Sequence, residues 1–324
     1  SLFVGPAAPV PAPRAVIEVL ESVEITSQSR GRSAFQLVFE LDKRSPLHTL
    51  FMLTGGSLPP IMRVVLAVSV RGVSEVLIDG VMTNHEVSPG GKGAAPKLTI
   101  TGEDLARVMD HIDFSGTPFP AMPPEARVLL ILAKYAPLGV IPMVIPSVLL
   151  DVPIPVERIP TQSGKDLGYI EALAEDVGYV FYLEAGPVPG TSVAYWGPEI
   201  KVGVPQKALN VDMDIHTNVE SMSFSIDTES STLPVLLYHD SLTKAPIPIP
   251  VPNVTPLNPP LGAVMPLPKK IEWISGTGKY GPVRTALVGL AKAAATADAV
   301  SATGSLDVLR YGRPLRARRL VGVR

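Results

Sequence analysis

The stretch GKDLGYIEALAEDVGYVFYLE, residues 164–184, mixes carboxylates with tyrosines and poses a choice between an active site and a structural element. One apolar stripe at helical spacing is formed by Leu167, Ile170, Leu173, Ala174 and Val177. Ser163 precedes the stripe as a good helix cap, and Gly178 ends it as glycine commonly ends helices. Glu171 and Glu175 lie on the opposite face. The pattern therefore predicts a helix whose charges face water.

A β-hairpin is expected directly after this helix. Side chains in residues 179–183 alternate between two faces, as they do along a β-strand. The segment TSVAYWG, residues 191–197, can pair with this strand across the turn GPVPG. Glu175 and Asp176 are neighbours on the helix and point about 100° apart, so they cannot form a facing pair of catalytic carboxylates.

Length and composition favour a multidomain protein that buries much apolar surface. A chain of 324 residues exceeds the usual size of one hydrophobic core, so two or three domains are expected. The net charge of -2 argues against a nucleic-acid partner, because phosphate binding needs a basic excess. With 46% hydrophobic and only 18% charged residues, the chain favours burial beyond the need of one monomer, as in obligate assemblies.

Two apolar stretches resemble targeting or membrane segments but do not fit them. Residues 128–150 are long enough to cross a bilayer, yet Pro137, Pro142 and Pro146 break helical geometry. A helix from Glu125 to Tyr135 followed by buried extended chain is expected instead, with no membrane span. Residues 1–14 lack the basic start of a secretion signal and are predicted to form a proline-stiffened arm.

The first hundred residues have the pattern of antiparallel strands. In SAFQLVFEL, apolar side chains alternate at Phe35, Leu37, Phe39 and Leu41. Further strands are predicted from Ala15, on both sides of Gly72 and Gly80, and in PKLTITG, which predicts a small barrel or sandwich. The segment GEDLARVMDHI, residues 102–112, predicts a short helix.

Alternation returns in residues 208–239, which predict two or three strands of a second β unit. Residues 244–270 are rich in proline and are expected to form an arm or long loop, because proline cannot enter a central strand. A helix is predicted for residues 283–299. Residues 304–312 and 315–323 are interpreted as two strands hinged at YGRP.

Motifs for catalysis or metal binding are incomplete. NHEVSP has Pro89 where a zinc-protease helix needs its second histidine, and SGTGKYG, residues 275–281, lacks the residues of a phosphate loop. Asp212, Asp214 and His216 share one face of a predicted strand and could hold a cation, although a solvated face is favoured. We therefore predict no catalytic, cofactor-binding or metal-binding residues.

The unit TQSGKDLGYIEALAEDVGYVFYLEAG, residues 161–186, resembles the signature segment of the phage late control protein D family. LTITGEDLARVMD and GSLDVLRYGRPLRARRLVGVR resemble the same family. Its members are central baseplate hub proteins of contractile phage tails. They are related to the hub half of the type VI secretion spike and to the hubs of extracellular contractile injection systems.

The resemblance implies a mainly β fold with α (α+β), in which two tube-like antiparallel β-barrels flank a mixed helical and hairpin region. The implied parts are an arm at 1–14, a first barrel at 15–102, a connecting domain at 103–205, and a second barrel at 206–324 with a proline-rich arm at 244–270. In such hubs the last strand continues into further strands, so a longer chain is expected.

The implied function is that of a structural hub and not of an enzyme. A homotrimer would adapt a threefold spike below to a sixfold inner tube or tube-initiator protein above, with baseplate wedge proteins around it. It would assemble in the cytoplasm of the producing bacterium and leave it in a phage tail or tail-like particle. Two alternatives are a tail-associated hydrolase that uses His85, His216 or His239, and a carbohydrate- or effector-binding module built on Tyr195 and Trp196.

Overall fold

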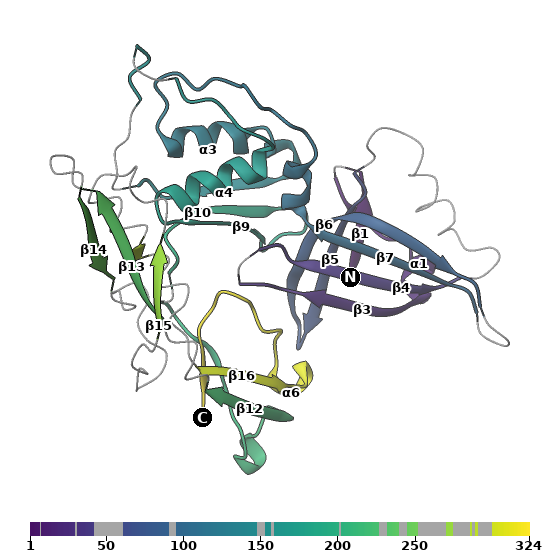
Figure 1. Cartoon of the computed structure of the whole chain (residues 1–324). Helices are drawn as coiled ribbons and strands as arrows, with labels where there is room; N and C mark the ends of the chain where they lie inside the picture. Colours follow the sequence, from purple (N-terminus) through teal and green to yellow (C-terminus); the bar gives the residue numbers. More distant parts are fainter. Residues whose placement is uncertain are drawn as a thin grey trace. The chain divides into compact units, whose positions relative to one another are not determined.

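The structure is a computed structural model, and it describes residues 1–6, 8–29, 31–41, 61–90, 95–147, 153–156, 159–200, 202–226, 232–239, 245–251, 270–274, 286, 289–290 and 300–324. The chain forms two compact units. The first unit contains residues 1–144, 151–171 and 181–196, and the second contains residues 145–150, 172–180 and 197–324. Figure 1 shows strands as the main element of both, so the predicted mainly β fold with helices is confirmed at this level.

A seven-stranded antiparallel sheet forms most of the first unit, in the order β2-β1-β5-β6-β7-β4-β3. Its elements are β1 (Leu2–Gly5), β2 (Val10–Pro11), β3 (Leu20–Thr26), β4 (Ala34–Glu40), β5 (Arg63–Val70), β6 (Val73–Ser88) and β7 (Lys97–Asp104). The short helix α1 (Arg14–Glu18) joins β2 to β3.

The core of this sheet follows the predicted alternation. Phe35, Leu37 and Phe39 on β4 are at most 3% exposed. They share one cluster with Leu2 of β1 and Val16 of α1, and with residues of β5, β6 and β7. Because strands from both halves of the sheet contribute to one core, the sheet is curled around it.

The predicted first barrel is not closed among the described strands, because β2 and β3 remain the two edges of an open sheet. Residues 2–5, expected in an arm, form β1 inside the sheet because Leu2 and Val4 enter the core. Residues 15–18, expected in a strand, lie in α1, whose Val16 is the buried residue. Gly80, expected between strands, lies within β6.

A smaller layer follows in the chain. It contains the 3-10 helices η2 (Leu105–Asp110) and η3 (Ala136–Leu138), the helices α3 (Pro124–Ala133) and α4 (Asp166–Asp176), and the strands β8 (Val140–Val144), β9 (Val180–Ala185) and β10 (Ser192–Gly197). The strands form a sheet in the order β8-β10-β9, with β8 parallel to β10. The predicted helix, its buried stripe and the hairpin are confirmed. The predicted helix at 102–112 is shorter, because residues up to Asp104 pair in β7.

The described residues of the second unit form three small sheets, β11-β17, β12-β16 and β14-β13-β15. Its elements are β11 (Gln206–Leu209), η4 (Asp214–His216), β12 (Ser221–Ile226), β13 (Thr232–His239), β14 (Pro246–Pro250), β15 (Lys270–Ile274), β16 (Val300–Ser305), α6 (Val308–Tyr311) and β17 (Val321–Val323). The predicted strands within 208–239 are therefore present. The described strands do not close a second barrel.

Several elements of the second unit differ from the predicted ones or lie partly outside the described residues. Part of the proline-rich segment is the edge strand β14, while residues 252–269 and most of the helix predicted at 283–299 lie outside the described residues. Residues 308–311 are helical and not a strand, because the Asp307 side chain accepts a hydrogen bond from Leu309 N at 2.8 Å and caps the turn. Among the described residues, no helix is long and apolar enough to cross a membrane.

Candidate interaction surfaces

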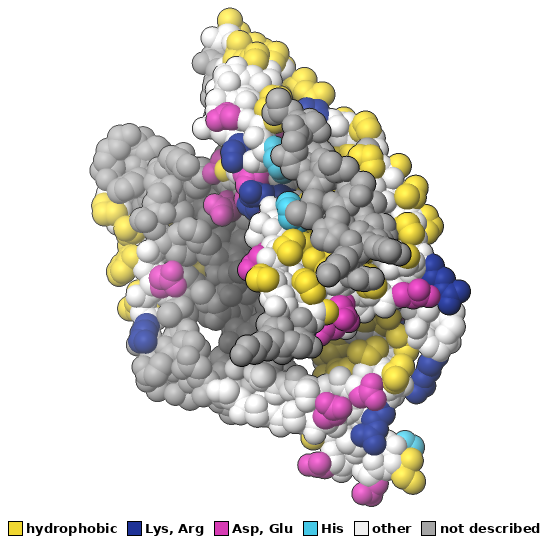
Figure 2. Space-filling model, turned by 90° about the vertical axis from the view of Figure 1, so that its right-hand side faces the viewer, with side chains coloured by type: hydrophobic (Ala, Val, Ile, Leu, Met, Phe, Trp, Pro, Cys, Tyr) yellow, Lys and Arg dark blue, Asp and Glu magenta, His cyan; other side chains and the backbone are white. Residues whose placement is uncertain are grey.

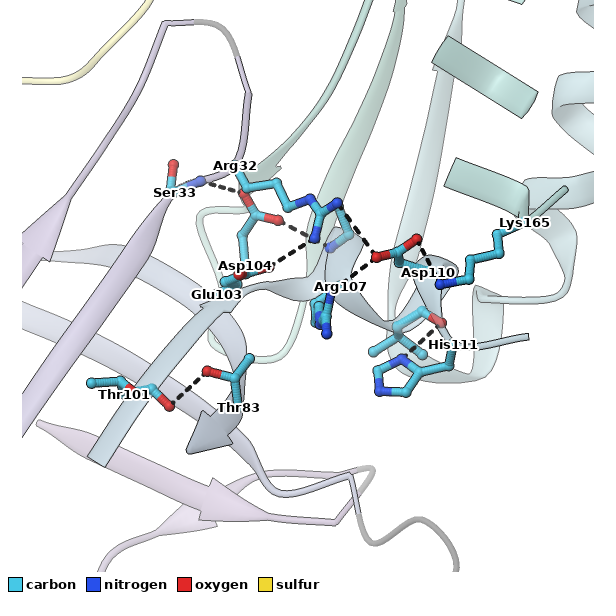
Figure 3. A network of polar contacts seen from close by, with 12 residues as sticks. Arg32, Ser33, Thr83, Thr101, Glu103, Asp104, Arg107, Asp110, His111 and Lys165 are labelled. Carbon is cyan, nitrogen blue, oxygen red and sulfur yellow. Dashed lines mark hydrogen bonds and ion pairs between the residues drawn. The ribbon is translucent and has the colours of Figure 1, made fainter. Parts of the chain in front are cut away.

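Asp110 at the end of η2 lies at the centre of a polar network (Figure 3). Its carboxylate accepts from Arg107 at 2.9 Å and from Arg32 at 3.5 Å, and it pairs with Lys165 Nζ at 3.4 Å. These cations come from η2, from the connection between β3 and β4, and from the turn before α4. Asp110 therefore connects three segments that are distant in sequence.

The neighbouring carboxylates of this network are also occupied. Asp104 accepts a hydrogen bond from Ser33 N at 2.6 Å and caps η2 through Ala106 N at 3.1 Å. Glu103 pairs with Arg32 at 2.9 Å. Burial lowers the pKa of Arg32. Its hydrogen bond to Glu103 and the nearby carboxylates raise this pKa by more than burial lowers it, so the pKa lies above the ordinary value. Carboxylates engaged in this way stabilise structure and are poorly placed to exchange protons with a substrate.

A buried ion pair links the large sheet to the hairpin layer of the first unit. Arg63 on β5 donates to both carboxylate oxygens of Asp79 on β6, at 2.7 and 2.6 Å, and the two side chains are 2% and 0% exposed. Arg63 also donates to Gly190 O at 2.9 Å, and Ser192 Oγ donates to Asp79 at 3.3 Å. The sequence offered a signal that was missed: Arg63 begins a largely apolar strand, and Asp79 follows the apolar pair Leu77 and Ile78.

Asp166, the first residue of α4, is also fully buried. It accepts from Tyr135 Oη at 2.7 Å and Gln162 Nε2 at 2.6 Å, and it pairs with Lys134 at 2.6 Å. Burial, together with the hydrogen bond and charge of Asp166, raises the pKa of Tyr135. This acid belongs to the stretch 164–184, and unlike Glu171 and Glu175 it faces the interior and not water.

The trio that could have held a cation is not arranged as its hypothesis requires. Asp212, Asp214 and His216 do not share a strand face, since they lie in a turn and η4, and both aspartates have a positive φ. The described residues contain no group of potential metal ligands. His85 lies in β6, and the His239 side chain is outside the described residues.

The aromatic hairpin is packed inward. Trp196 is 0% exposed and Tyr195 is 9% exposed. Tyr195 stacks on Tyr182 with ring centroids 5.0 Å apart. The carbohydrate-binding alternative required Trp196 to be accessible for stacking, so that hypothesis is wrong.

The arginine-rich end of the chain is held by β11. Gln206 Nε2 donates to Arg316 O and Gln206 Oε1 accepts from Arg316 N, both at 2.9 Å. Tyr311 is fully buried, and its hydroxyl donates to Lys207 O. Lys207 Nζ in turn donates to Tyr311 O at 2.8 Å. The terminal segment is therefore an integrated part of the second unit.

The ribbon of β12 and β16 has two chemically different faces. Its register places Ser223 opposite Thr303 and Ser225 opposite Ser301, and Ser221 Oγ lies 2.8 Å from Ser305 Oγ, so one face carries hydroxyls. Met222 and Phe224 alternate with these serines and lie on the other face, as do Ala302 and Gly304 opposite them. Phe224 is 58% exposed. Met222 packs against the cluster of Leu209, Val219 and Tyr311, so Phe224 is the large apolar side chain of this face that stays more than half exposed.

Other large apolar side chains are exposed in both units. Leu129 and Leu130 on α3 and Ile141 and Met143 on β8 are between 45% and 52% exposed. Trp273 on β15 is 56% exposed. Figure 2 shows groups of hydrophobic side chains on one face of the molecule, with scattered charged side chains between them. Apolar surface of this kind is typical of proteins that bury it in contacts with other chains.

The fold occurs in known tail proteins. The structure is similar to the 43 kDa tail protein of prophage MuSo2 from Shewanella oneidensis, with a TM-score of 0.56 and 12% identity over 93% of this chain and 82% of that one. It is also similar to the tail protein from Neisseria meningitidis MC58, with a TM-score of 0.51 and 16% identity over 90% of this chain and 74% of that one.

A chain of a Francisella PdpA-VgrG complex is similar with a TM-score of 0.50 and 11% identity, over 85% of this chain and 43% of that one. No protein-family model and no curated protein matches the sequence. The predicted kinship with phage tail and spike-related proteins is thus confirmed as a likeness of fold.

Proposed function

We propose that the chain, which has the fold of phage tail proteins, is the structural hub of the baseplate in a contractile tail or injection particle. In this proposal three copies form a ring that adapts a threefold spike to a sixfold inner tube. The observation that carries it is the similarity over nearly the whole chain to two tail proteins, together with the signature segment at 161–186. A spike protein, an inner tube or tube-initiator protein and baseplate wedge proteins are the proposed partners.

The exposed apolar side chains support a role in assembly. Phe224, Trp273 and Met143 lie on three different strands and are each more than half exposed. Contacts between permanently associated subunits are more apolar than the rest of a protein surface. We infer that contacts between copies cover part of these surfaces, and that the hydroxyl face of β12 and β16 stays in water.

The role proposed here needs no catalysis. Asp79, Asp104, Asp110 and Asp166 all bind cations or hydrogen-bond donors of the same chain. These contacts support a structural role for the buried and half-buried aspartates. They favour the hub over the tail-associated hydrolase. The particle is proposed to assemble in the producing bacterium and to function after release.

Mass measurement tests the proposal. Light scattering on the purified chain is expected to give the mass of a trimer, and electron microscopy a ring with a central hole. Phe224→Ser should weaken the trimer because it removes an apolar contact, whereas the neighbouring Ser223→Ala, on the hydroxyl face, should leave the mass unchanged. A purified chain that remains a monomer at all concentrations would contradict the proposed ring.

A further inference from the structure

In three edge strands of the described residues, β2, β8 and β14, the register places prolines on the side that faces away from the neighbouring strand. The clearest case is β14, PIPIP, which pairs antiparallel with β13 and is an edge of its sheet among the described strands. In an antiparallel pair, the N–H and C=O of one residue point to the same side, and successive residues alternate. Proline has no N–H, so the donors from β14 to β13 are Ile247 and Ile249, opposite Tyr238 and Leu236. The backbone of Pro246, Pro248 and Pro250 therefore points away from β13.

The edge strand β2 of the large sheet has the same arrangement. Ala12 N donates to Leu2 O at 2.8 Å, and Val10 pairs with Val4, so these residues point toward β1. Pro11, between them, points outward. Pro9 and Pro13 continue the same spacing in the sequence on both sides. The outer edge of β2 therefore has no N–H donor at position 11.

The third case is β8, an edge strand of the three-stranded sheet, which pairs in parallel with β10. Ser192 N donates to Gly139 O at 3.0 Å, and Ser192 is in register with Val140. This pattern directs the backbone of residues 139, 141 and 143 toward β10 and that of Pro142 outward. The N–H of Val140 is used within the chain, by Tyr135 O at 3.4 Å.

The opposite edge of the large sheet differs. Asp104 N donates to Ser33 O at 2.9 Å, which sets the odd residues of β4 toward β7 and its even residues toward β3. Glu24 and Thr26, opposite Gln36 and Ala34, therefore bond to β4, and Val23 and Ile25 direct their N–H groups outward. No proline occurs in β3. Outward prolines therefore occur on some edges of this chain and not on β3.

We propose that the outward prolines of β2, β8 and β14 close these edges to strand addition by another chain. A strand that arrives at β14 meets carbonyl acceptors without N–H donors, so half of the ladder cannot form. Because of these outward prolines, apolar and strand-rich chains can come close together without forming β-sheet pairs at these edges. It is a property of the single chain and does not depend on the proposed hub function.

Restoring the donors of β14 tests the inference. In the variant Pro246→Val, Pro248→Val and Pro250→Val, the outward N–H groups return. We expect intermolecular β-sheet, measured by its amide I infrared band, to appear at about a tenfold lower protein concentration than in the unmodified chain. Amide hydrogen exchange at positions 246, 248 and 250 should become slower as concentration rises.

Two controls separate edge closure from other effects. Ile247→Val with Ile249→Val changes the same strand but retains its prolines, and Pro187→Val removes an exposed proline of the turn between β9 and β10; neither should lower the onset concentration. Pro248→Val alone returns one outward N–H and tests the same expectation if the triple variant does not fold. Folded proline variants with an unchanged onset and unprotected new amides would overturn the proposal.

Discussion

At the scale of single residues, Arg63 and Asp79 show how a buried charge pair can fix a tertiary contact. Removing one partner leaves an uncompensated charge in the interior, so Asp79→Asn and Arg63→Met should each lower the free energy of unfolding by about 3–5 kcal/mol. Denaturant unfolding measures this loss. The double variant Arg63→Met with Asp79→Leu should lose less than the sum of its single changes, because no unpaired charge remains.

An exposed pair provides the comparison for this prediction. Lys97 and Glu21 are 2.6 Å apart, but each side chain is 46% exposed. Lys97→Met should therefore change the free energy of unfolding by less than about 1 kcal/mol. Equal losses for the buried and the exposed pair would mean that burial does not decide the strength of these interactions.

Tyr135 gives a prediction for pH dependence. Its pKa in the folded chain is raised above the unfolded value of about 10. The unfolded chain therefore loses this proton first as pH rises, so the stabilisation is full below about pH 10 and is lost above it. Unfolding measured between pH 8 and 11 should show a shallower alkaline decline for Tyr135→Phe than for the unmodified chain. Parallel declines would contradict this role.

At the scale of elements, the register of β4, β6 and β7 depends on glycine. Gly102 lies opposite Phe35, and a Cβ added to it would overlap the Phe35 ring and Val81 O. Gly102→Ala should therefore lower the free energy of unfolding by about 1–3 kcal/mol through overpacking. Phe35→Leu in the same chain should recover part of this loss in a double-mutant cycle.

The matched control for this element is Gly203, where an added Cβ meets nothing within 4 Å. Gly203→Ala should alter the free energy of unfolding by no more than about 0.5 kcal/mol. If both glycine variants behave alike, contact with Phe35 is not the reason for glycine at position 102.

At the scale of the whole molecule, the first unit is built from separated parts of the chain. A chain that ends at residue 144 keeps the large sheet but loses Gly190, Ser192 and the parallel partner of β8. We expect the chain that ends at residue 144 to be cleaved more readily in pulse proteolysis than a chain that ends at residue 200. Equal resistance would show that the hairpin does not stabilise the sheet.

Periodicity and local chemistry made several elements predictable from the sequence. The helix stripe at 167–177, the alternation of Phe35, Leu37 and Phe39, and the hairpin after Gly178 depend on neighbours a few residues away, so their patterns were sufficient. The signature segment also predicted the likeness to tail proteins. Helix α1 was missed because its single turn is set by packing of Val16 and not by a repeated pattern.

The sequence by itself determined which segments become strands or helices and which of their faces are apolar, because these properties follow from spacing along the chain. The tertiary structure alone decided the open sheet, the place of β1 within it and the pairing of Arg63 with Asp79. The register sets Arg63 opposite Val81 and Val65 opposite Asp79, which makes the two charges diagonal neighbours. Such contacts join residues far apart in sequence, so no local pattern encodes them.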